Sequence, residues 1–147
     1  AGKEAERYQF FEQLLERSNR VIRLFEGVSP QGYQSWLSAG SGKSGVAFQY
    51  VVRNADSKAE LFIAGADADL IRRRFDFLHE HKVEIEQAFG GELEWDSRED
   101  RKQKYVRTWC NVGGFKDKDQ WDEVHACMVD RMKRLSEALA PFIQRLP

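Results

Sequence analysis

A Gly-Lys-Ser sequence at residues 42–44 has the residue types that close a phosphate-binding loop. The complete motif, G-x-x-x-x-G-K-[ST], needs another glycine where this chain has Leu37, and a helix directly after the loop. Residues 46–52 are instead rich in β-branched and aromatic side chains, which predicts a strand. We therefore predict that the glycines serve backbone geometry and that no nucleoside triphosphate binds. Ser41 and Lys43 stay candidate binding residues.

The histidines do not predict a metal site. His79 and His81 are two residues apart on a predicted helix, so their side chains point about 200° apart. His125 is distant in the sequence. No cofactor is predicted either.

Carboxylates on predicted strands raise the question of nuclease chemistry of the PD-(D/E)xK type, which combines acidic metal ligands with a lysine. The position two residues after Glu60 is Phe62, and the position two residues after Glu94 is Asp96. The lysine is missing in both cases, and the sequence has no G-x-S-x-G nucleophile motif. We therefore predict no catalytic residues in this chain.

The most suggestive charged segment is the predicted hairpin around residues 96–109. Its basic residues are Arg98, Arg101, Lys102, Lys104 and Arg107. Together with Tyr105 and Trp109, a cationic hairpin of this kind can contact phosphates and stack on bases. However, Asp96, Glu99 and Asp100 lie among these cations, which favours a solvated hairpin of mixed charge over a nucleic-acid contact. Both interpretations stay open.

Elements that position these residues follow from hydrophobic periodicity. The sequence predicts a helix at 4–25, a loop at 29–45, strands at 46–53 and 59–63, a helix at 67–89, strands at 93–96 and 105–112, and a helix at 118–144. We predict an α+β fold with a four-stranded antiparallel sheet and three helices, in the order α-β-β-α-β-β-α. The helices should pack mainly against one face of the sheet.

Strand alternation places Arg53, Glu60 and Arg107 on the less covered face of this sheet. We predict that Glu60 lies beside at least one of the two arginines. The group would then form either a structural ion pair or the floor of a binding groove.

Composition sets limits on the class of protein. The chain of 147 residues is 41% hydrophobic and carries a formal net charge of −1, which argues against intrinsic disorder and against a domain-wide basic surface. Cys110 and Cys127 are predicted to be buried free thiols, as is typical of a reducing cytoplasm. The sequence has no apolar run of the ~20 residues that span a membrane and no signal-peptide pattern, so we predict a cytoplasmic protein without membrane contact.

Four segments carry a resemblance to a known family: "WLSAGSGKSG", "AELFI", "FDFLHEHKVEIEQAFGGELEW" and "DQWDEVHACMVDRMKRLSEAL". From about Phe10 to Phe142, the chain resembles an uncharacterised bacterial and archaeal domain. This domain commonly follows a domain that resembles PD-(D/E)xK nucleases. The resemblance implies a companion module whose parent protein holds the chemistry elsewhere, and it supplies no catalytic residues for this chain.

We therefore expect residues 1–147 to form a single accessory domain, the C-terminal part of a longer protein. Its leading predicted function is non-catalytic, with DNA or a nuclease-like domain of the same protein as its partner. The alternative is a protein-interaction or oligomerisation module without nucleic-acid contact. An independent small enzyme has the least support.

Overall fold

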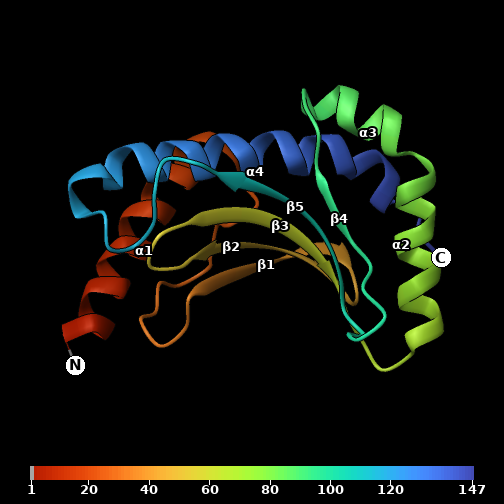
Figure 1. Ribbon diagram of the computed structural model, residues 1–147, viewed down its shortest axis with the longest axis horizontal. Coiled ribbons are helices and arrows are strands. Elements are labelled where there is room, and N and C mark those ends of the chain that lie inside the picture. The colour runs from red at the N-terminus through yellow and green to blue at the C-terminus, as the bar shows by residue number, and fades with distance from the viewer. Residues whose placement is uncertain (1) are drawn as a thin grey trace.

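Five strands form one antiparallel sheet in the order β1-β2-β3-β5-β4, with four α-helices around it (Figure 1). The computed structural model describes residues 2–147. Its elements are α1 (Gly2–Val21), β1 (Trp36–Lys43), β2 (Val46–Val52), β3 (Ser57–Ile63), α2 (Ala68–Glu80), α3 (Lys82–Phe89), β4 (Glu94–Asp96), β5 (Lys104–Cys110), a 3-10 turn (Lys118–Gln120) and α4 (Trp121–Ile143). The fold is α+β, but the predicted four strands and three helices are wrong.

The missed strand is β1, which lies in the segment predicted to be a loop. Its glycines and serines hid the strand, because these residues are typical of turns. The alternation is nevertheless present, since buried Leu37 and Ala39 follow exposed Trp36 and Ser38. The Gly-Lys-Ser sequence thus ends β1 and enters the tight turn to β2, where Gly45 has a φ of +82°. Phosphate-binding geometry requires a strand-loop-helix order that this hairpin does not have.

The extra helix arises because the helix predicted at 67–89 is two helices. Asp67 caps α2 by accepting hydrogen bonds from the backbone of Asp69 and Leu70. The chain leaves helical geometry at His81, and α3 then ends at Gly90, which has a φ of +92°. The break lets α3 lie beside α4 (Figure 1).

Helix α4 provides the main covering layer of the sheet and packs against β2, β3 and β5. Figure 1 shows it running across one face of the strands, with α1 and α2 at opposite ends of the sheet. The strand residues beneath it are apolar, as illustrated by Phe48, Leu61 and Val106, which are all buried. Tyr50 also lies on this face, and its hydroxyl shares a hydrogen bond of 2.8 Å with Ser18 of α1. We call this side of the sheet the covered face.

The two cysteines form a disulfide bond, so the prediction of free thiols is wrong. Cys110 ends β5 and Cys127 lies in α4, with their Cα atoms 6.1 Å apart. The packing of α4 across the sheet brings these residues together, and that packing was not visible in the spacing of two cysteines. No described helix is both long and apolar enough to cross a membrane.

Candidate functional site

The opposite side of the sheet, which we call the open face, has no helix over it in the part of the chain that the structure describes (Figure 1). Strand alternation gives this face every second residue. Its main side chains are Trp36 and Ser38 of β1, Gln49 and Val51 of β2, Lys58, Glu60 and Phe62 of β3, Glu94 and Asp96 of β4, and Tyr105, Arg107 and Trp109 of β5.

A row of polar side chains crosses this face from one sheet edge to the other. Its members are directly opposed in the strand register: Ser38, Gln49, Glu60, Arg107 and Glu94. Each is hydrogen-bonded to the next. Ser38 donates to Gln49 at 3.2 Å, and the Gln49 amide donates to Glu60. Every strand therefore contributes one residue to a continuous polar row.

Arg107 is the centre of this row and contacts three carboxylates. Its Nε donates to Glu60 at 2.9 Å, and its Nη1 donates to Glu94 at 2.7 Å and to Asp96 at 2.9 Å. Glu60 is only 2% exposed and also pairs with Lys58 at 3.3 Å. Burial alone would lower the pKa of Arg107, but its three carboxylate partners raise it. The predicted proximity of Glu60 to an arginine is confirmed.

Asp96 joins the row to the β4–β5 hairpin. Besides Arg107, it accepts hydrogen bonds from Arg101 and from both the backbone and the Nε of Arg98. Burial alone would raise the pKa of Asp96, but the bond from Arg107, the Arg98 backbone bond and the charges of Arg101 and Arg107 bring it to about 2. The Glu94 pKa is also lowered, chiefly by its hydrogen bond from Arg107.

Aromatic rings flank the polar row, and cations already lie against two of them. Trp109 has the Lys58 ammonium 4.7 Å and the Arg53 guanidinium 5.2 Å from its ring centre. Tyr105 similarly has Arg107 at 4.6 Å and Arg101 at 5.0 Å. Such contacts stabilise the cations by the negative face of each ring. The open face thus carries paired charges and aromatic side chains.

Five of the predicted binding residues lie on or beside the open face: Arg53, Glu60, Arg98, Arg101 and Arg107. Arg53 is also paired with Asp56 through two hydrogen bonds of 2.6 and 2.7 Å. Lys102 is exposed at the hairpin.

The structure places the remaining predicted residues in supporting roles. Lys104 is buried, and its ammonium donates to the backbone carbonyls of residues 97, 98 and 101, which holds the hairpin loop together. The Ser41 hydroxyl donates to the Val46 carbonyl at 2.6 Å, and Lys43 donates to the Leu146 carbonyl at 3.0 Å. Ser41 and Lys43 therefore stabilise the β1–β2 hairpin and its contact with the C-terminal segment.

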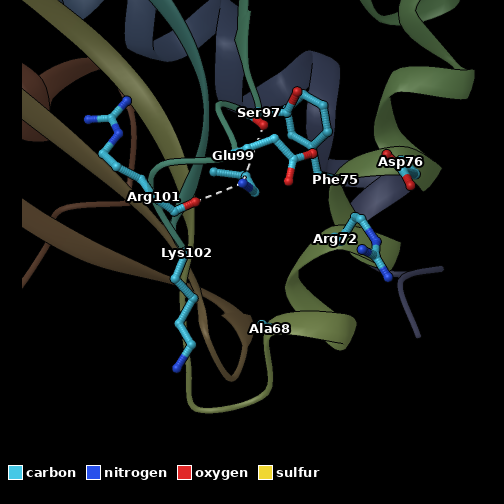
Figure 2. Close-up of a pocket in the computed structure, with 9 residues that line it drawn as sticks. Ala68, Arg72, Phe75, Asp76, Ser97, Glu99, Arg101 and Lys102 are labelled. Atoms are coloured by element: carbon cyan, nitrogen blue, oxygen red, sulfur yellow. Dashed lines mark hydrogen bonds between the residues drawn. The ribbon is translucent and has the colours of Figure 1, made fainter.

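A cavity of about 390 Å³ lies between α2 and the β4–β5 hairpin and is lined by several basic residues. Figure 2 shows that the side chains of Arg72, Arg101 and Lys102 point away from one another and out of this cavity. A phosphate site needs donors that converge on one anion. The arrangement is therefore unsuited to gripping a phosphate.

Metal ligation does not suit the open face, because Arg107 occupies the position between its carboxylates. Among residues 2–147, no group of three or more His, Cys, Asp and Glu side chains is placed to hold a metal ion. His125 lies in the core instead, where its Nε2 is 3.0 Å from the Phe10 carbonyl.

Sequence reasoning missed most of the neutral and aromatic members of the open face. Trp36 and Ser38 lie in β1, which was not predicted, and Gln49 and Phe62 carry no charge that marks them as candidates. Alternation within β2 and β3 does place Gln49 and Phe62 on the open face.

A model of the family described as "Domain of unknown function (DUF4268)" matches residues 6–143, so the chain belongs to this family. No curated protein and no solved structure matches it significantly.

Proposed function

We propose that this domain is a non-catalytic accessory module of a nuclease or defence-type protein, and that its open face docks onto the catalytic partner. The observation that carries the proposal is a full sheet face that no layer of residues 2–147 covers, on which the buried charges are paired with one another and aromatic side chains remain accessible.

The composition of this face favours a protein surface as the ligand. Antiparallel sheets often have one solvated face, and such a face is ordinarily polar. Here Trp36 is 41% exposed, and Phe62, Tyr105 and Trp109 are half-buried. Tryptophan, tyrosine and arginine are the residues that contribute most often to protein–protein binding energy. Internal pairing of the charges also means that a partner need not supply groups to satisfy them.

Nucleic acid is the second candidate, and aromatic rings beside arginines are the observation that favours it. The charges of the hairpin weaken this candidate. Lys104 and Arg107 are buried and hydrogen-bonded, while Arg98 and Arg101 are bonded to Asp96. Few cations of the hairpin are therefore left to contact phosphates.

The test is a binding measurement between this chain and the protein segment encoded directly upstream in the same gene, by isothermal titration calorimetry. We expect a 1:1 complex that the double variant Trp36→Ala/Phe62→Ala weakens at least about tenfold. Val83→Ala is the matched control, because Val83 is 67% exposed and lies on α3 rather than on the sheet. The absence of a complex, or an equal loss with Val83→Ala, would contradict the proposal.

An electrophoretic shift assay at about 50 mM salt tests the second candidate with duplex and single-stranded oligonucleotides. Under the docking proposal we expect no shift. A shift that Arg98→Ala/Lys102→Ala removes would establish nucleic-acid binding through the hairpin instead.

A further inference from the structure

A second surface, away from the sheet, has the geometry of a binding groove. It measures about 720 Å³ and lies between the exposed side of α1 and the loop that leads to β1. Glu4, Tyr8 and Glu12 line it from α1, where their spacing of four residues stacks them along one side of the helix. Pro30 and Tyr33 line it from the loop. The groove therefore follows α1 for about two turns.

The loop side of the groove is fixed in place. Gly32 approaches the α1 backbone so closely that a Cβ there would lie 2.0 Å from the Glu4 carbonyl oxygen. Arg7 donates from its Nη1 to the Gly32 carbonyl at 2.8 Å, and Gln31 donates to the Trp36 carbonyl at 2.7 Å. A wall anchored to both α1 and β1 needs little ordering on binding, which favours affinity.

The side chains of this groove suit a cation. Both charged lining residues, Glu4 and Glu12, are acidic, and neither forms a salt bridge within residues 2–147. The Arg7 guanidinium is engaged with the Gly32 carbonyl and lies 5.6 Å from the Phe115 ring centre. Tyr8 is 43% exposed and Tyr33 is 79% exposed, so both can offer ring faces to a ligand.

We propose that this groove binds a basic peptide segment, with arginine or lysine side chains between the carboxylates of Glu4 and Glu12 and the rings of Tyr8 and Tyr33. Aromatic rings attract cations through their negative faces, and carboxylates accept charge-assisted hydrogen bonds from them. The uniform acidic charge of the lining opposes a nucleic acid, whose phosphates the carboxylates would repel. A peptide of alternating sign gains less, since its acidic residues would meet Glu4 and Glu12.

The experiment titrates the intact chain with an end-blocked peptide of alternating arginine and glycine, followed by isothermal titration calorimetry. We expect saturable 1:1 binding that weakens as salt rises from about 50 to 200 mM. Glu4→Gln/Glu12→Gln should weaken it at least about tenfold, and Tyr33→Ala should weaken it several-fold. Glu16→Gln is the matched control, because Glu16 is also exposed on α1 but is paired with Arg20.

Three results would overturn the proposal: no binding to the wild-type chain, an equal loss with Glu16→Gln, or equal binding of a glutamate–glycine peptide. Circular dichroism of each variant excludes unfolding as the cause of a loss, and the exposed positions make unfolding unexpected. The test is independent of the docking proposal for the open face, since Trp36→Ala/Phe62→Ala should bind the arginine peptide as the wild type does.

Discussion

The two faces of the sheet bury polar groups in different ways, although both are built from the same five strands. On the covered face, isolated polar groups each find a partner in another element, as Tyr50 does with Ser18 and as Thr108 does with Arg131 at 3.1 Å. On the open face, charged groups of neighbouring strands pair with one another around Arg107.

This difference teaches what each face contributes. The covered face stabilises the fold through apolar burial beneath α4, and its polar groups are incidental to that burial. The open face satisfies its own charges within the sheet, so a second layer could cover it without leaving a buried charge unpaired. A face that is electrostatically complete yet rich in accessible aromatic side chains is suited to association.

The largest expected effect comes from removing the centre of the open-face network. Arg107→Met should lower the free energy of unfolding by about 3–5 kcal/mol at pH 7, because it leaves Glu60, Glu94 and Asp96 close together without their shared cation. Urea unfolding would measure this loss. Arg53→Met is the control, with a loss below about 1 kcal/mol, since its pair with Asp56 is exposed.

The pH dependence of the free energy of unfolding gives a second test of this network. The folded-state pKa of Asp96 is about 2, below its ordinary value of about 3.9. A lowered pKa contributes stability above the unfolded-state value, and this contribution is lost as the pH falls toward 2. Arg107→Met lacks the hydrogen bond that does most to lower this pKa. The difference in free energy of unfolding between wild type and variant should therefore narrow from about pH 4 downward. If this difference stays constant between pH 7 and pH 3, the variant loses stability for a reason other than the loss of the charge network.

Two neighbouring residues of β3 allow the contribution of the two faces to stability to be compared directly. Leu61 is fully buried under α4, whereas Phe62 is half-buried on the open face. We expect Leu61→Ala to cost about 3 kcal/mol in urea unfolding, because it leaves a cavity in the packed core. Phe62→Ala should cost about 1 kcal/mol, since its ring is partly solvated already. Equal costs would mean that the open face is as much a part of the core as the covered face.

A buried histidine on the covered side gives an effect of the same kind in a different pH range. His125 is fully buried between α1 and α4, and burial, with a smaller effect of Arg17, lowers its pKa to about 4. The unfolded chain binds this proton at about pH 6.5, so stability should decline from there toward pH 4.

This decline should reach about 2–3 kcal/mol at pH 4, as measured by urea unfolding across the range. His125→Gln should flatten it, because the amide can still donate to the Phe10 carbonyl but does not titrate. The open-face contribution of Asp96 should persist in this variant until the pH falls below about 4. An unchanged decline in His125→Gln would assign the effect to other groups.

How far the sequence predicts this molecule depends on how local the signal is. The alternation of β3 and β5 placed Glu60 and Arg107 on one face, and the predicted proximity of Glu60 to at least one arginine followed from it. The strand β1 was missed because its composition resembles a loop, and its pairing with β2 is what makes it a strand. Pairing with a neighbouring strand can therefore override the loop that local composition predicts.

The break at His81 and the disulfide bond share a different cause. No glycine or proline marks the end of α2, so periodicity continues through a turn that only the packing of α3 on α4 requires. Likewise, Cys110 and Cys127 are joined because α4 lies over the end of β5. Ligand preference is less predictable still, because the number of cations in the β4–β5 hairpin does not show that backbone carbonyls hold Lys104 and carboxylates hold Arg107.

The smallest effect on stability is expected at Trp36, and it is the one that separates fold from function. Trp36 lies on the edge strand β1 with 41% of its surface exposed, while the next residue, Leu37, is buried on the covered face. Its backbone carbonyl accepts a hydrogen bond from Gln31, which an alanine would keep. Trp36→Ala should therefore change the free energy of unfolding by about 0.5 kcal/mol or less, against about 2–3 kcal/mol for Leu37→Ala, both measured in urea. If Trp36→Ala is as destabilising as Leu37→Ala, the tryptophan belongs to the fold, and the open face has no spare aromatic surface with which to bind a partner.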